Sequence, residues 1–182
     1  MTIRSPLALR LLTPLFLLVA GLSAAAAEPD AHALAGTWKI DLARSTELSP
    51  WKSLELTITP QGSTVTIERK LTWSRREFID RLVLDTTQPV NALPIDWWSD
   101  NRHLGAYIGS KHTRDVRHEW LDGGRVLRLS TDLVLDAQQG PRAVNILTDF
   151  KVSASGSELT LTELRSTRNR PVVYVFKRLA AK

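Results

Sequence analysis

The sequence predicts an all-β protein, specifically a single antiparallel up-and-down β-barrel of about 8–9 strands. Strand-like segments follow one another, separated by turn signals every ~8–12 residues. No segment shows the periodicity of an amphipathic helix. The first strand opens with Gly36-x-Trp38 and the last ends with the basic pair Lys177-Arg178, which suggests a sheet that closes on itself. A two-sheet β-sandwich is the main alternative.

The first 27 residues are predicted to be a secretory signal peptide. Arg4 and Arg10 supply the positive region, residues 11–22 are largely apolar, and small residues follow them. Cleavage is expected after Ala25 or Ala27. The apolar run is short for a transmembrane helix, which needs ~20 residues, so an uncleaved N-terminal anchor is the less favoured alternative. We therefore expect a periplasmic or extracellular protein.

Residues 28–33 are predicted to be a disordered lead-in, and residues 34–182 to be one barrel domain. The sequence contains no cysteine, so neither a disulfide nor a cysteine-linked lipid is available. A domain of this length can bury a core without such support. The formal net charge of +5 falls to +3 when Arg4 and Arg10 leave with the signal peptide. Basic residues are spread along the chain, so we expect no nucleic-acid partner.

The first predicted strand covers residues 36–41. The polar connection over residues 44–51 is expected to contain one helical turn, capped by Ser45 or Thr46. Residues 53–59 alternate between apolar and polar side chains, which is typical of a half-buried strand.

A hairpin turn over residues 60–63 leads to a strand over residues 64–74. Arg69 shares a face of this strand with apolar side chains, and Glu163 does the same on the strand over residues 158–166. Such a residue indicates either a bulge that shifts the register or a polar group inside the barrel. If both point inward, they could pair or orient the polar head of a ligand.

Residues 77–85 form another strand, with apolar side chains in both rows. The pattern then breaks over residues 86–110, an aromatic-rich stretch that includes Tyr107 and is expected to be a lid, a portal loop or a folded excursion. The adjacent indoles of Trp97 and Trp98 can stack on an apolar ligand at the barrel mouth, insert at a membrane interface or anchor a protein partner. Alternatively, they plug a barrel end as part of the core. The remaining predicted strands, joined by short turns, cover residues 111–120, 125–136, 142–152, 158–166 and 171–178.

Catalytic motifs are absent from the sequence: there is no cysteine nucleophile, Gly-x-Ser-x-Gly, phosphate loop, dinucleotide fingerprint or His-Glu-x-x-His. His112 and His118 share a strand face but are roughly 20 Å apart on an extended chain, too far to share a metal. Asp115 and Glu119 on the opposite face are expected to be solvated. We therefore expect no catalytic residue, no metal and no cofactor.

The two ends of the domain resemble those of the lipocalin-like (calycin) β-barrels, whose first strand carries Gly-x-Trp and whose last carries an Arg or Lys that packs on the tryptophan. The run from Gly36 to Ser45, Gly-Thr-Trp-Lys-Ile-Asp-x-x-x-Ser, also resembles the opening of small secreted bacterial proteins of this type, whose roles are mostly unassigned. The resemblance implies that Gly36 lets the chain turn in tightly, that Trp38 plugs one end of the barrel, and that Arg178 or Lys177 lies across the indole.

The leading hypothesis is a binding protein that holds a small apolar or amphipathic ligand non-covalently in the barrel lumen. The alternative is a non-catalytic envelope-interaction or inhibitor-like module with a filled core, which uses the Trp97-Trp98 loop to contact a protein partner or a membrane. An enzyme on the same fold is the least supported reading. The candidate ligand-binding residues are Trp97, Trp98, Tyr107, Arg69, Glu163 and Trp73, and the candidate closure residues are Gly36, Trp38 and Arg178.

Overall fold

The computed structural model describes residues 33–48, 50–96, 107–108 and 111–180. The predicted signal peptide, together with Trp97 and Trp98, lies outside these residues. Within them, no helix is both long enough and apolar enough to cross a membrane.

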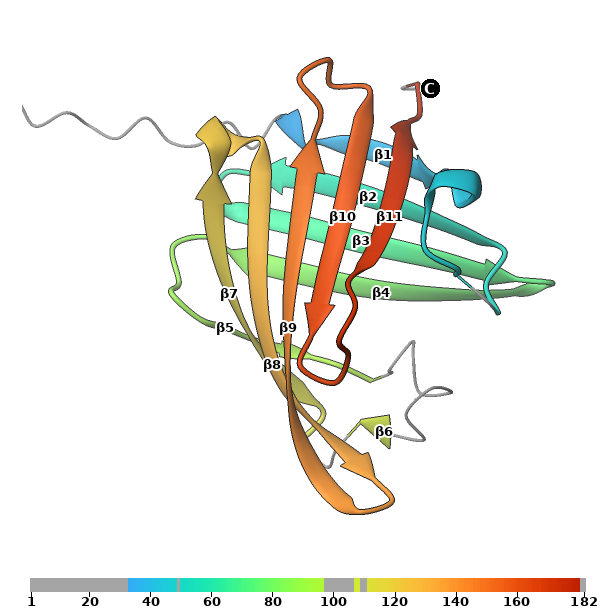
Figure 1. The fold of residues 1–182 in the computed structure, drawn as a ribbon. Helices are drawn as coiled ribbons and strands as arrows, with labels where there is room; N and C mark the ends of the chain where they lie inside the picture. The colour runs from blue at the N-terminus through green and yellow to red at the C-terminus, as the bar shows by residue number, and fades with distance from the viewer. Residues whose placement is uncertain (1–32, 49, 97–106, 109–110, 181–182) are drawn as a thin grey trace, which may run out of the picture.

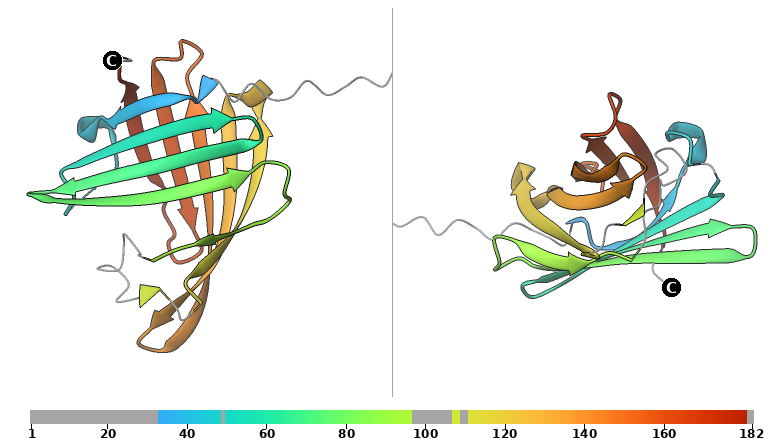
Figure 2. Two further views of the ribbon diagram at one scale, coloured as in Figure 1. Left: turned by 180° about the vertical axis from the view of Figure 1, so that it is seen from behind. Right: turned by 90° about the horizontal axis from the view of Figure 1, so that it is seen from below.

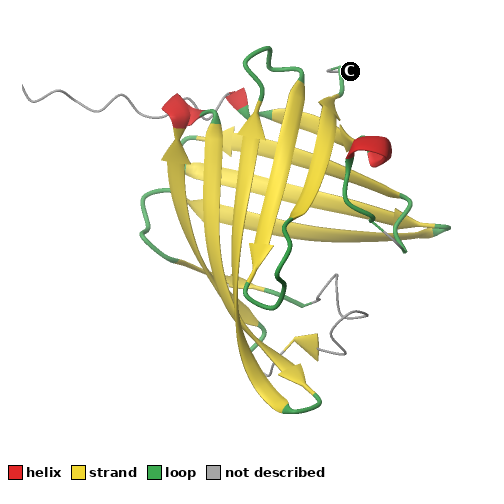
Figure 3. Ribbon diagram, viewed as in Figure 1, coloured by secondary structure: helices red, strands yellow, loops and turns green. Residues whose placement is uncertain are grey.

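The described chain is almost entirely strand (Figures 1 and 3). Two single turns of 3-10 helix, η2 (Leu42–Arg44) and η3 (Asp122–Gly124), interrupt it. The strands are β1 (Gly36–Ile40), β2 (Ser53–Gln61), β3 (Thr64–Trp73), β4 (Arg76–Asp85), β5 (Asn91–Pro94), β6 (Tyr107–Ile108), β7 (Thr113–Leu121), β8 (Val126–Ala137), β9 (Gly140–Val152), β10 (Glu158–Arg165) and β11 (Val172–Arg178).

All these strands belong to one antiparallel sheet, which confirms the predicted barrel and excludes two separate sheets. The strand order is β4-β3-β2-β1-β11-β10-β9-β8-β7-β5, and β6 pairs with β8. The first and last strands join directly, with Trp38 opposite Arg178. In the described residues no ladder joins β4 to β5, so the barrel is nearly, but not fully, closed. The path has ten strands rather than eight or nine, and β5 and β6 lie in the stretch that was expected to be irregular.

The barrel is flattened into two curved layers that cross one another (Figures 1 and 2). Strands β1 to β4 form one layer and β7 to β11 the other, and their inward side chains interdigitate as a close-packed core. Strands β8 and β9 extend beyond the rest, with β6 beside them. The main core contains Trp38, Leu56, Ile67, Leu84, Leu127, Phe150, Leu161 and Phe176, and a second cluster near the extension contains Ile95, Leu133, Leu135, Val144 and Ile146.

One end of the barrel is closed around Trp38, whose side chain is fully buried. The indole N–H donates to the carbonyl of Leu34 at 3.1 Å. The Arg178 guanidinium carbon lies 3.9 Å from the centre of the indole ring. Gly36 adopts a φ of 128°, and a β-carbon there would lie 2.8 Å from Arg178 Nη1. Glycine therefore provides both the backbone conformation and the space that the arginine occupies.

The helical turn predicted within residues 44–51 lies earlier, at η2, because Asp41 is its N-cap. The Asp41 carboxylate accepts from the Ala43 N–H at 3.2 Å. Ser45 and Thr46 instead accept main-chain N–H bonds from β11, both at 2.9 Å. The connection is thereby fastened to the closing strand.

Candidate functional site

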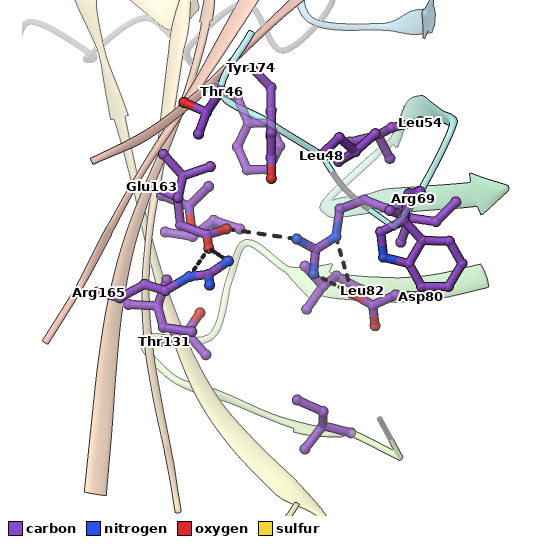
Figure 4. Close-up of a pocket in the computed structure, with 18 of the residues that line it drawn as sticks. Thr46, Leu48, Leu54, Arg69, Asp80, Leu82, Thr131, Glu163, Arg165 and Tyr174 are labelled. Carbon is purple, nitrogen blue, oxygen red and sulfur yellow. Dashed lines mark hydrogen bonds and ion pairs between the residues drawn. The ribbon is translucent and has the colours of Figure 1, made fainter. Parts of the chain in front are cut away.

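A cavity of about 110 Å³ lies between the main core and the second cluster. Strands from both layers line it, together with the segment between η2 and β2 (Figure 4). Its wall combines apolar side chains with several charged ones. The apolar side chains include Leu48, Leu54, Leu71, Leu82, Ile95, Leu129, Leu133, Ile146, Phe150 and Val172, and the charged ones are Glu47, Arg69, Asp80, Arg114, Glu163, Arg165 and Arg168.

Arg69 points into this cavity from β3. The ladders on both sides of it are uninterrupted, with Leu56 opposite it on β2 and Asp80 opposite it on β4, so there is no bulge at this position. Its guanidinium holds the Asp80 carboxylate through Nη2 at 2.5 Å and Nε at 3.2 Å. Of the two alternatives that the sequence left open for Arg69, a bulge or a polar group inside the barrel, the structure shows the second.

Glu163 lies across the lumen on β10, where the pairing with β9 and β11 is also continuous. Its side chain is only 6% exposed. Its carboxylate accepts from the guanidinium of Arg165, two residues along the same strand face, and lies 3.9 Å from Arg69 Nη1. Figure 4 shows the resulting chain of ion pairs from Arg165 through Glu163 and Arg69 to Asp80.

Arg114 extends the same chain from β7. Its Nη2 donates to the second oxygen of Asp80 at 2.8 Å, and its side chain is 5% exposed. Asp80 thus holds two guanidiniums, one from each layer of the barrel. This contact also bridges β7 and β4 on the side where the ladder is interrupted.

The charges in the cavity influence one another's ionisation. Burial alone would raise the pKa of Asp80, but the guanidiniums of Arg69 and Arg114 outweigh burial and lower the pKa below its usual range. Burial would lower the pKa of Arg69, yet Asp80 and Glu163 together raise it. Arg114 differs, because burial lowers its pKa in spite of Asp80. Asp80 remains a carboxylate at neutral pH, and Arg114 is the less fully compensated of the two cations.

The structure brings together two of the six candidate ligand-binding residues, Arg69 and Glu163. Trp73 lies at the end of β3 with 44% of its area exposed and does not line the cavity. Tyr107 is described only as part of β6, paired with Asp136. Trp97 and Trp98 lie outside the described residues, so the interaction-module alternative stays a prediction from the sequence.

Sequence reasoning missed Asp80 and Arg114. The same signal that singled out Arg69 and Glu163, a charged residue on the apolar face of a strand, is present at both positions. Asp80 shares a strand face with Phe78 and Leu82, which point inward. Arg114 shares a strand face with Val116, which also points inward. No cluster of three or more metal-binding side chains occurs in the described part of the chain. The arrangement offers apolar walls and a set of fixed, buried donors and acceptors, which suits the reversible binding of an amphipathic molecule.

Comparisons with known proteins bear on the fold. No protein-family model and no curated protein matches the sequence. Among solved structures, a fatty acid binding protein of Schistosoma mansoni in complex with arachidonic acid matches with a TM-score of 0.52 and 11% sequence identity. The match covers 81% of this chain and 97% of that one. The chain therefore has the fold of the lipocalin-like (calycin) β-barrels.

Proposed function

We propose that the protein is a binding protein for a small amphipathic molecule, held non-covalently in the barrel lumen. One observation carries the proposal: the cavity wall combines apolar side chains from two hydrophobic clusters with a chain of ion pairs. Charged side chains are rarely buried without a functional or structural reason. In this position they would orient the polar end of a ligand whose apolar part contacts the wall.

The driving force would be the burial of apolar ligand surface, at about 25 cal/mol per Å². At about 110 Å³, the cavity is smaller than an engineered cavity of ~150 Å³ that binds benzene. It therefore has room for the head and first carbons of a longer chain. The arachidonic acid complex of the Schistosoma protein supports the choice of an amphipathic lipid as the first probe.

The test is a fluorescence titration of the delipidated protein with dansylaminoundecanoic acid. We expect saturable, single-site binding. Thr131→Trp should reduce affinity at least tenfold, because Thr131 lines the cavity from β8 and the indole would fill it. Val134→Trp is the matched control on the outward face of the same strand, where the side chain is 37% exposed. Absence of saturable binding, or equal effects of the two variants, would contradict a ligand site in the lumen.

We also propose that the protein works outside the cytoplasm. The support is the N-terminal segment, with its arginines at positions 4 and 10, its apolar stretch and its small residues before Glu28. Expression of the full chain in a Gram-negative host should yield periplasmic protein whose mass corresponds to cleavage after Ala25 or Ala27. Full-length protein retained in the cytoplasmic fraction would contradict export.

A further inference from the structure

Among the described cations that line the cavity, Arg114 is the one with a fully buried nitrogen that lacks a hydrogen-bond partner. Its Nη2 bonds Asp80, but its buried Nε has no hydrogen-bond partner. The side chain is 95% removed from solvent, being 5% exposed, so water access is minimal. A buried donor without a partner destabilises the folded protein, and more so when it is charged. The site therefore contains an unmet demand for a hydrogen-bond acceptor.

The charge around Arg114 is also undercompensated. Asp80 is shared with Arg69, which has a second carboxylate nearby in Glu163. Arg114 has no second carboxylate within ion-pair distance among the described residues. Burial accordingly lowers its pKa, although a guanidinium stays protonated in proteins. An acceptor that carries negative charge and reaches the guanidinium from the cavity would compensate that charge.

The surroundings of Arg114 indicate what the rest of such a ligand looks like. Leu133 is its register partner on β8, and Ile95 follows β5, which pairs with β7. Both belong to the second cluster together with Ile146, and all three line the cavity. An anionic group at Arg114 would therefore have an apolar wall directly beside it.

We propose that the ligand is an amphipathic anion, with a carboxylate, sulfate or phosphate monoester that accepts from the Arg114 guanidinium and an apolar body against Ile95, Leu133 and Ile146. This inference rests on the proposed binding function and specifies its ligand class. It also assigns Arg114 a role in choosing the ligand, in addition to its contact with Asp80 across the interrupted side of the barrel.

Head-group selectivity tests the proposal by isothermal titration calorimetry of the delipidated protein with four probes of equal chain length: decanoate, decyl sulfate, decanol and decyltrimethylammonium. We expect decanoate or decyl sulfate to bind at least tenfold more tightly than decanol, and the cation to bind most weakly. The preferred anion identifies the head group. For decanoate the advantage should disappear below about pH 4, where the ligand is protonated, and for decyl sulfate it should persist.

Arg114→Gln should reduce the affinity for the preferred anion about tenfold, to the level of decanol. Arg114→Lys keeps the charge and should restore part of the preference. Arg117→Gln is the matched control, because Arg117 lies on the outward face of the same strand and is 47% exposed.

Equal binding of decanoate, decyl sulfate and decanol by the unaltered protein would overturn this inference and leave the binding function standing. A preference for anions that persists in a folded Arg114→Gln variant would overturn the role of Arg114. Failure of all four probes to bind would instead contradict the binding function itself. The comparison of probes on the unaltered protein needs no variant to fold, so the inference remains testable even if Arg114→Gln is unstable.

Discussion

The closed end of the barrel and the cavity hold their arginine side chains in opposite ways. At the closed end, Arg178 lies on the indole of Trp38 and donates to the main-chain carbonyls of Ala33, Ala35 and Gly156. Around the cavity, guanidiniums donate instead to carboxylate side chains, and one N–H stays without a partner.

The difference shows what distinguishes a plug from a binding site. Arg178 is tied to the backbone, which cannot move away without unfolding, so this end of the barrel is sealed and rigid. Arg69 and Arg114 instead pair with the side chain of Asp80, which thereby connects the two layers of the barrel. Donors held this way are preorganised and can donate to a new anionic partner.

The largest effect is expected when the plug is removed. Trp38→Ala should lower the free energy of unfolding by about 3–5 kcal/mol, because it leaves a large void among fully buried neighbours. Urea denaturation followed by circular dichroism measures it. Trp73→Ala is the control, expected to cost less than about 1 kcal/mol because that indole is 44% exposed. Similar losses in the two variants would show that Trp38 does not close the barrel.

Next in size is the loss of the carboxylate between the two layers. Asp80→Asn should destabilise the protein by about 3 kcal/mol at neutral pH, because it leaves Arg114 without its described carboxylate. The pKa of Asp80 is lowered in the folded state, so its contribution is complete above the unfolded pKa of ~3.9 and is lost as the pH falls towards the folded value.

Urea denaturation of both proteins between about pH 7 and pH 2 measures this dependence. The difference in stability should shrink as the pH drops below about 4. A difference that stays constant down to about pH 2 would mean that the Asp80 carboxylate is not stabilised by its neighbours.

A smaller loss is expected at the closed end when the cation alone is removed. Arg178→Gln keeps an amide donor but gives up the contact with the indole, so we expect a loss of about 2 kcal/mol in the free energy of unfolding. Ligand affinity should be unchanged, since Arg178 does not line the cavity. A marked loss of affinity in the folded variant would mean that the two ends are coupled.

The smallest effect should come from an ion pair on the outside. Arg81 and Glu68 pair at 2.7 Å on the outward faces of β4 and β3, and the Arg81 side chain is 62% exposed. Arg81→Gln should cost no more than about 0.5 kcal/mol, because solvent screens the pair. Thermal denaturation in low and high salt measures it. A cost as large as that of Asp80→Asn would remove the contrast between inner and outer ion pairs.

The sequence predicted much of the fold because its signals are local. Strand periodicity and turn residues located the long strands, and Trp38 and Arg178 mark the strands that meet. The position of η2 was missed because Asp41 could serve as strand end or helix cap, and only the contacts of Ser45 and Thr46 with β11 decide between them.

The site was less predictable because it depends on pairing between distant strands. Arg69 and Glu163 stood out from their apolar rows, and the same rule applied to Asp80 and Arg114 would have found all four. Their grouping could not be predicted, because it requires the register of β3 against β4 and the approach of β7 across the interrupted side. The cavity volume depends on every side chain along its wall, which no single strand encodes.

Among the described residues no ladder joins β4 to β5, so main-chain hydrogen bonds between strands are lacking along one flank of the barrel. In the described residues that flank is crossed by side chains: the Asp80–Arg114 pair, and Asn91, which bonds both the N–H and the carbonyl of Asp85. Parting the strands there would break these side-chain contacts but no ladder among the described residues, and it would leave the plugged end undisturbed. Amide hydrogens along this flank of β4 should accordingly exchange with deuterium sooner than those of β1, which is held on both sides.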